Sequence, residues 1–304
     1  MHRHEPHDIH DHFSARDDRA FGTSVALNLG LVAVQVGFGY YAHSLALVAD
    51  AGHNLGDVLG LILGWMGSFL SRRKPGGRRT FGLRRSSILA TLLNGLLLIL
   101  VSGALGWEAL HRFRDPQPVQ GGVVMLVAAI AVAVNAGSAL LFLRGSSRDL
   151  NLRGAYLHLM GDAAVSVAVV LSGGIIWATG WNWVDPLASL LVMAAILYAT
   201  YELLTESLDL LLDAVPSGVD LEAVRLWLRE RPGVTGVHDL HVWAVSTTET
   251  ALTAHLVMAD GHPGDRFLRD LALELHSRFD IEHPTIQIEV GDGTECIFEP
   301  DTAL

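Results

Sequence analysis

Long apolar runs separated by short polar or charged connections occupy the first two thirds of the chain. The first run, residues 21–42, has no charged residue and is long enough to cross a bilayer, which takes roughly 20 residues as a helix. Comparable runs follow at residues 44–70, 86–107, 119–143, 155–178 and 187–201. The pattern predicts a membrane all-α bundle of six transmembrane helices.

The connections between these runs predict an orientation. Basic residues crowd the second connection, which has no acidic residue, and they recur in the fourth. The third connection has only Arg112 and Arg114, and the first and fifth have no Lys or Arg. Because cytoplasmic loops are enriched in Lys and Arg, we expect the second and fourth connections, and with them both termini, in the cytoplasm. The basic residues of these two connections are Arg72, Arg73, Lys74, Arg78, Arg79, Arg84, Arg85, Arg144, Arg148 and Arg153.

The pattern changes to that of a small soluble domain after residue 208. Amphipathic and alternating stretches predict the order helix, strand, strand, helix, strand. The stretches are residues 221–231, 237–245, 251–258, 265–279 and 285–290. This order predicts a small α+β domain with helices on one face of a sheet. We therefore expect a histidine-rich cytosolic tail (1–20), a transmembrane domain (21–208) and a cytosolic domain (209–304).

Ionisable side chains inside two predicted spans point to a function, because such groups are costly at membrane depth. His53 and Asp57 are four residues apart in the second span, so they share a helix face. His158 and Asp162 repeat that spacing in the fifth span. Two imidazoles and two carboxylates make a four-ligand set that suits tetrahedral Zn²⁺. We predict that these four residues bind a divalent metal ion. Asp50 lies outside the repeat, so we expect it to cap a helix end or to support a neighbouring ligand.

An ion gradient is the expected energy source. A phosphate-binding P-loop needs a Gly-Lys pair, and Lys74, the only lysine, follows Arg73. The His-Glu-x-x-His motif of zinc proteases is also absent from the sequence, and we do not expect an enzyme. His and Asp must lose protons to bind metal, so protons and metal compete for the site. Alternate opening to the two sides of the membrane turns that competition into metal–proton exchange.

Composition narrows the class of partners. Hydrophobic residues make up 50% of the chain, as expected of a protein partly buried in lipid. The formal net charge of −11 comes mainly from the acidic region beyond Val215. Nucleic acid is therefore not an expected partner, because phosphate binding needs clustered Lys and Arg. Cys296 is the only cysteine, which excludes an intrachain disulfide and a four-cysteine zinc site within one chain.

Histidines outside the spans form a second candidate group of ligands. His241 and His255 fall on adjacent predicted strands, and His283 and Glu289 flank the last one. Together they are a candidate regulatory metal site, whereas singly each is an ordinary surface or sheet residue. The N-terminal tail either collects metal or is merely a solvated, flexible segment. Its histidines are His2, His4, His7, His10 and His12.

These motifs together resemble the cation diffusion facilitator family, and in particular its bacterial zinc exporters. The matching segments are Leu-Val-Ala-Asp-Ala-Gly-His (47–53) with Asp57, Thr-Phe-Gly (80–82), Ile-Leu-Ala (88–90), His158 with Asp162, Asp185-Pro186, Val-His-Asp-Leu-His-Val-Trp (237–243) and Ile-Glu-His-Pro-Thr-Ile-Gln-Ile-Glu (281–289). The resemblance implies a homodimer in the bacterial inner membrane, with a ferredoxin-like cytosolic domain that binds metal and dimerises. It also implies proton-coupled efflux of zinc or cadmium by alternating access.

The resemblance carries over to particular residues. It places the transport site on the two His-Asp pairs, and a cytosolic zinc site on His241, His255, His283 and Glu289. It also pairs Arg85 with Asp213, as a charge pair that ties the bundle to the soluble domain. Two features depart from the family pattern. The second connection has no His, Asp or Glu, so a metal site that some relatives carry there is expected to be missing. Cys296 stands alone with Glu299 where some members have a cysteine pair.

Two alternatives to a zinc exporter remain open at this point. A membrane metal sensor would bind metal at the same four residues without moving it, and proton counterflow in vesicles separates the two functions. The other alternative is a transporter of a different divalent cation, such as Fe²⁺ or Mn²⁺. Two histidine ligands argue against Mn²⁺, which prefers oxygen, but they do not separate Zn²⁺ from Cd²⁺ or Co²⁺.

Overall fold

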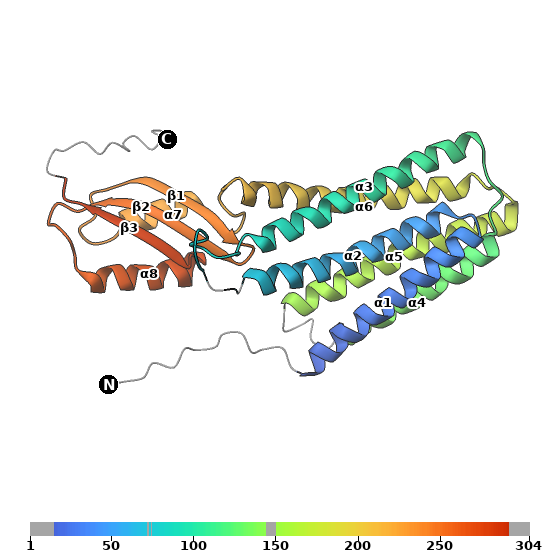
Figure 1. Cartoon of the computed structure of the whole chain (residues 1–304), viewed down its shortest axis with the longest axis horizontal. Helices are drawn as coiled ribbons and strands as arrows, with labels where there is room; N and C mark the ends of the chain where they lie inside the picture. The colour runs from blue at the N-terminus through green and yellow to red at the C-terminus, as the bar shows by residue number, and fades with distance from the viewer. Residues whose placement is uncertain (1–14, 72, 74, 144–149, 292–304) are drawn as a thin grey trace. The chain divides into compact units, whose positions relative to one another are not determined.

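The computed structural model describes residues 15–71, 73, 75–143 and 150–291 (Figure 1). The chain divides into two compact units, each taken by itself below. The first unit comprises Met1–Leu61 and Leu96–Thr200, and the second comprises Ile62–Gly95 and Tyr201–Leu304. Several residues singled out in the sequence lie outside the described part. They are the histidines of the N-terminal tail, Arg72, Lys74, Arg144, Arg148, Cys296 and Glu299.

Six long helices account for the apolar runs. They are α1 (Ala15–Tyr41), α2 (Leu45–Ser71), α3 (Ser86–Arg114), α4 (Gly121–Leu143), α5 (Leu150–Thr179) and α6 (Val184–Leu211). Among the described residues, five of these helices, α2 to α6, are long and apolar enough to cross a membrane. The apolar part of α1, Val25–Tyr41, is shorter. Each predicted span thus coincides with one helix, and the predicted helical membrane domain is confirmed.

Large apolar side chains cover the outside of these helices. Leu100, Leu126, Leu171 and Leu191, from four different helices, are each more than half exposed. Exposed apolar surface of this extent is costly in water but is the ordinary outer face of a helix in lipid. The helices are therefore built to be surrounded by a bilayer.

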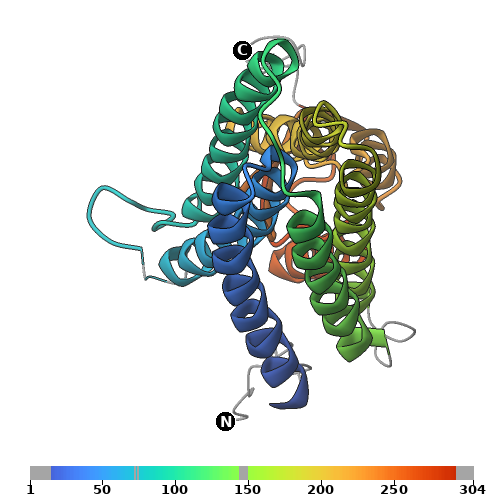
Figure 2. The same cartoon turned by 90° about the vertical axis from the view of Figure 1, so that its right-hand side faces the viewer.

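Glycines allow close helix approach within the first unit. A Cβ atom at Gly173 of α5 would lie 2.6 Å from the backbone nitrogen of Met125 on α4, so the two backbones touch there. On α2, a Cβ atom at Gly56 would overlap the side chain of Leu98 on α3. Small residues at such crossings let membrane helices pack by direct backbone contact. α1 lies beside α4 in both views (Figures 1 and 2).

The soluble part of the second unit is a three-stranded sheet with two helices. Its elements are α7 (Leu221–Arg229), β1 (Gly236–Ser246), β2 (Glu249–Val257), α8 (Asp265–Phe279) and β3 (His283–Glu289). The strand order is β1-β2-β3, with β1 antiparallel and β3 parallel to β2. The parallel pair needs a crossover, which α8 provides. The predicted order α-β-β-α-β is confirmed.

One face of this sheet carries the hydrophobic core. Leu252 and Leu256 of β2 are completely buried and share a cluster with Leu228 of α7 and Leu275 of α8. Because side chains alternate along a strand, His255 points to the opposite face of β2. Both helices therefore cover one face, and the other face is left for the histidines.

The connection between α2 and α3 also belongs to the second unit and is joined to its soluble part. Arg85 forms an ion pair with Asp213, the pair that the resemblance implied. Next to it, Arg84 forms an ion pair with Glu249 at the start of β2. The backbone nitrogen of Thr247 donates to the hydroxyl of Ser87, at 3.1 Å. Within the second unit, three adjacent contacts thus hold the start of α3.

Candidate metal centre

The two His-Asp pairs predicted from the sequence meet between α2 and α5, inside the first unit. His53 Nε2 lies 3.1 Å from Asp162 Oδ1, within hydrogen-bonding distance. His158 Nε2 lies 3.6 Å from Asp57 Oδ1 and 3.7 Å from Asp162 Oδ2. The i, i+4 spacing places each His beside its own Asp, and each His also faces the Asp of the other helix. The four side chains thus form one cluster.

The spacing of these ligand atoms is close to what a tetrahedral ion needs. With Zn–N and Zn–O distances of about 2.0–2.1 Å, neighbouring ligand atoms of a tetrahedron are about 3.3–3.5 Å apart. The three contacts above bracket that range. His53, Asp57 and Asp162 each offer a ligand atom within 4.8 Å of the others, whereas His158 is outside this group, and its ring centroid is 6.4 Å from that of His53. A bound ion would therefore require these two imidazoles to close toward each other.

One carboxylate oxygen of the cluster, Asp57 Oδ2, lacks a hydrogen-bond donor among the described residues. The oxygen is buried. The nearest ring nitrogen, His53 Nδ1, lies 3.8 Å away. A buried carboxylate oxygen without a donor is costly, and a cation would satisfy it. His158 is the open side of the cluster, since its side chain is 52% exposed whereas that of Asp162 is 5% exposed.

Asp50 extends the contact between α2 and α5 by one helical turn. Its carboxylate, 1% exposed, accepts from the Ser166 hydroxyl at 3.0 Å and from the Gln35 amide at 2.5 Å. Gln35 also accepts from the Asn54 amide, at 3.1 Å. Asp50 thus joins α1, α2 and α5 directly beside the His-Asp cluster. Asp50 was singled out in the sequence, whereas its partner Ser166 was missed because serine is common in membrane helices.

Asp185 fixes the start of the helix that carries half of the cluster. Its buried carboxylate accepts from the Ser44 hydroxyl at 2.5 Å and from the backbone nitrogens of Leu45 at 2.7 Å and Ala46 at 3.4 Å. The nitrogens of Leu45 and Ala46 are the first backbone donors of α2, and such donors have no acceptor within their own helix. Asp185, at the start of α6, therefore caps α2 from another helix.

A second group of candidate ligands lies on the helix-free face of the sheet. His238 Nε2 and His255 Nδ1 lie 3.2 Å and 2.9 Å from the Glu289 carboxylate. These three residues each offer a ligand atom within 4.8 Å of the others. Asp239 links this group to His241, whose Nε2 lies 2.9 Å from Asp239 Oδ1. His255 and Glu289 were predicted members of this site, and His238 was not.

The structure places His283, the remaining predicted ligand, elsewhere. It pairs with Ala251 at the start of β3, whereas Glu289 pairs with Val257 at the end. Its Nε2 lies 3.2 Å from a guanidinium nitrogen of Arg84. His283 therefore does not meet Glu289, because the two are six positions apart along an extended strand.

A β-bulge explains why His238 joins His255. In the strand register His238 faces His255 and His241 faces Thr253, so two residues of β1 oppose one of β2 between these pairs. Asp239 in this bulge has a positive φ of 49°. In a regular strand His238 and His241 would point to opposite faces, but the extra residue brings both to the same one.

Comparisons with known proteins agree with this architecture. The family model of the cation efflux transmembrane domain matches residues 23–212, and that of the cation efflux protein cytoplasmic domain matches residues 216–290. The zinc transporter ZitB of Escherichia coli (strain K12) is 37% identical over 281 residues, covering 91% of this chain and 88% of that protein.

Two further relatives align over a similar number of residues. The metal cation efflux system protein CzcD of Cupriavidus metallidurans is 36% identical over 283 residues, covering 93% of this chain and 89% of its own. The cadmium, cobalt and zinc/H⁺-K⁺ antiporter of Bacillus subtilis (strain 168) is 32% identical over 285 residues, covering 92% and 91%. With both family models matched in order along one chain, this integral membrane protein belongs to the cation diffusion facilitator, or cation efflux, family.

Proposed function

We propose that this protein exports Zn²⁺ from the cytoplasm in exchange for protons, with Cd²⁺ and Co²⁺ as further substrates. The observation that carries the proposal is the cluster of His53, Asp57, His158 and Asp162, in which Asp57 Oδ2 is buried without a hydrogen-bond donor. Two nitrogen and two oxygen ligands suit these three ions. The names of the relatives, a zinc transporter and a cadmium, cobalt and zinc antiporter, support the same substrates.

Exchange of metal for protons follows because the same side chains of the cluster bind either protons or a metal ion. Without metal, an imidazole N–H can donate to a carboxylate, and the 3.1 Å distance between His53 Nε2 and Asp162 Oδ1 suits such a bond. Metal binding needs the same nitrogens and oxygens unprotonated, so an entering ion displaces protons and entering protons release the ion. When the cluster opens to the two sides of the membrane in turn, each cycle moves metal one way and protons the other. The cluster transports and carries out no bond-breaking chemistry, so the protein is not an enzyme.

Several further features belong to this proposal. Both termini and the basic α2–α3 connection face the cytoplasm, because Lys and Arg concentrate on that side. The transmembrane domain ends near residue 208, and the soluble domain beyond it faces the cytoplasm of a bacterial inner membrane. The protein acts as a homodimer, a proposal supported by the match to the cytoplasmic domain of the family. Zn²⁺ is its substrate and also the regulatory ion of the soluble domain.

The regulatory ion is proposed to bind at His238, His255 and Glu289. Both histidines are buried, and His238 Nε2 forms no hydrogen bond with any described residue, although Glu289 lies 3.2 Å away. Two imidazoles and one carboxylate provide three ligands, and Asp239 lies 3.4 Å from the second nitrogen of His255. This set keeps His255 and Glu289 of the four residues predicted from the sequence, adds His238, and leaves out His241 and His283.

Transport in vesicles tests the main proposal. Purified protein is reconstituted with a pH gradient, and Zn²⁺ uptake and proton release are measured together for wild type, Asp162→Ala and the exposed control Asp115→Ala. We expect counterflow in wild type and in the control, and none in Asp162→Ala. Equal transport by Asp162→Ala would exclude the cluster, and metal binding without counterflow would indicate a sensor. Transport that does not change between about pH 6 and 8, where histidine ordinarily titrates, would exclude proton exchange.

A further inference from the structure

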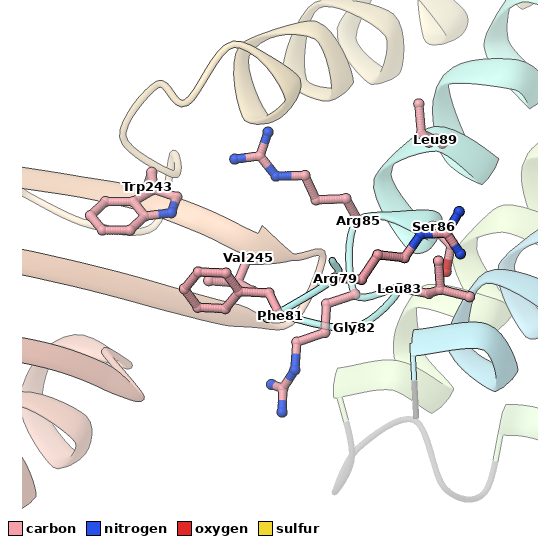
Figure 3. A pocket seen from close by; sticks show the side chains of 10 residues that line it. Arg79, Phe81, Gly82, Leu83, Arg85, Ser86, Leu89, Trp243 and Val245 are labelled. Atoms are coloured by element: carbon pink, nitrogen blue, oxygen red, sulfur yellow. The ribbon is translucent and has the colours of Figure 1, made fainter. Parts of the chain in front are cut away.

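A pocket beside the start of α3 combines positive charge with exposed apolar surface. It lies within the second unit and has a volume of about 290 Å³. The α2–α3 connection forms most of its lining, which the start of α3 (Ser86 and Leu89) and two residues of β1 (Trp243 and Val245) complete (Figure 3). The pocket shares no residue with either candidate metal site, so the transport chemistry does not explain it.

The charge of the pocket is only partly balanced. Three arginines line it, and two of them have acidic partners: Arg84 pairs with Glu249, and Arg85 with Asp213. Arg79 forms no ion pair with any described carboxylate. Ser86, the first residue of α3, lines the same pocket as Arg79. The N-terminus of a helix adds partial positive charge, so this end of the pocket favours an anion.

The rim of the pocket is apolar and exposed. The side chains of Phe81 and Leu89 are 54% and 51% exposed. Leu89 belongs to α3, a helix apolar enough to cross a membrane, so the rim continues onto a surface suited to hydrocarbon. Trp243 adds an aromatic ring of the kind that is common at the membrane interface. An inorganic anion would leave this apolar surface unused, whereas a lipid would cover it.

The position of the pocket also favours a lipid. The connection that forms it joins the ends of two membrane helices and carries basic residues without any acidic one. Basic segments directly beside a membrane helix attract anionic phospholipids, and basic pockets between such helices hold their headgroups. We propose that this pocket binds the headgroup of an anionic phospholipid, with the phosphate on Arg79 and an acyl chain against Leu89.

Bound lipid would connect the membrane surface to the soluble domain. Arg79 is in the same short connection as Arg84 and Arg85, whose acidic partners are in the soluble part of the second unit. A phosphate held by Arg79 adds a third charged contact to that connection. The inference does not depend on the proposed transport function, because it concerns binding of lipid in the absence of metal.

Lipid binding to the metal-free, full-length protein tests the inference. Phosphatidylglycerol is titrated onto wild type, Arg79→Gln and Arg78→Gln in detergent, and bound lipid is counted by native mass spectrometry, with phosphatidylcholine as the uncharged reference. Arg78 is the matched control, because it is an exposed arginine of the same connection that does not line the pocket. We expect Arg79→Gln to weaken phosphatidylglycerol binding about fivefold, the effect of one arginine near an anionic lipid, and Arg78→Gln to change it less than twofold.

Three outcomes would overturn the inference. Equal losses in both variants would mean that the connection attracts lipid only through its overall charge. Wild-type binding by Arg79→Gln would remove Arg79 from any lipid site. Competition by millimolar inorganic phosphate would assign the pocket to a free anion, since phosphate has no chain to place against Leu89.

Discussion

The Ser166 hydroxyl on α5 donates to the Asp50 carboxylate on α2, one helical turn from the contact between His53 and Asp162. Three contacts therefore follow one another along the two facing helices: Asp57 with His158, His53 with Asp162, and Asp50 with Ser166. The third contact contains none of the proposed metal ligands. We expect it to fix the position of α2 along α5, and with it which of the proposed ligand atoms meet.

Ser166→Ala is expected to weaken Zn²⁺ binding without unfolding the protein. The hydrogen bond itself contributes about 1 kcal/mol, and a shift of α2 along α5 would move His53 away from Asp162. We expect Zn²⁺ affinity to fall about five- to tenfold, measured by calorimetry on the purified protein.

The control for Ser166 is Ser172, on the same helix. Ser172 is also buried, and its hydroxyl has no hydrogen-bond partner among the described residues. Ser172→Ala should therefore leave Zn²⁺ affinity unchanged. Equal affinities for Ser166→Ala and Ser172→Ala would show that the Asp50 contact does not position the ligands.

His158→Asp should change which metal the protein binds. The variant replaces an imidazole nitrogen with a carboxylate oxygen, and oxygen ligands favour Mn²⁺ relative to Zn²⁺. We expect Zn²⁺ affinity to fall by about 10- to 100-fold and Mn²⁺ to compete better than in wild type. Competition binding with both metals measures the ratio. His111→Asp, an exposed position on α3 outside the cluster, should keep the wild-type ratio. If both variants prefer the same metal as wild type, His158 is not a ligand.

Asp185→Ala should lower stability through the loss of the α2 cap. It removes three hydrogen bonds and leaves the Ser44 hydroxyl and two backbone donors without their acceptor. Loss of a helix cap costs about 1–2 kcal/mol, and unsatisfied buried donors add to it. The melting temperature in detergent should therefore fall, and Asp185→Asn, which keeps one acceptor oxygen, should recover part of the loss. A melting temperature equal to wild type for Asp185→Ala would mean that other donors and acceptors replace the cap.

Much of the fold was predictable because its signals are local. Apolar run length gave the membrane helices, and alternation gave the strands of the soluble domain. The two His-Asp pairs were predictable for a related reason: the i, i+4 spacing fixes a shared helix face whatever surrounds it. The contacts of Asp50 with Gln35 and Ser166 were not predictable. Helices that are apolar on all sides carry no pattern that says which face meets which neighbour.

The proposed metal site of the soluble domain depends on an irregularity in a strand. Strict alternation along β1 would place His238 and His241 on opposite faces of the sheet, and the prediction from the sequence included His241 but not His238. The extra residue in the bulge at Asp239 changes which face of the sheet the preceding side chains of β1 point to, so His238 lies on the same face as His241. The bulge does leave a mark in the sequence, because two polar residues separate the buried Val237 and Leu240, whereas one residue separates Leu240 from Val242.

The choice between His238 and His283 as a ligand of the soluble site can be measured directly. His238→Ala removes a buried imidazole that lies 3.2 Å from Glu289, whereas His283→Ala removes one that lies beside Arg84. We expect His238→Ala to abolish one class of Zn²⁺ sites in calorimetry, and His283→Ala to leave the number of sites unchanged. Both variants are made in the full-length protein carrying Asp162→Ala, so that the proposed transport site does not contribute to the signal. Loss of the site in His283→Ala but not in His238→Ala would restore the set predicted from the sequence. It would mean that β3 shifts along β2 when metal binds, because in the present register His283 and Glu289 are at opposite ends of the strand.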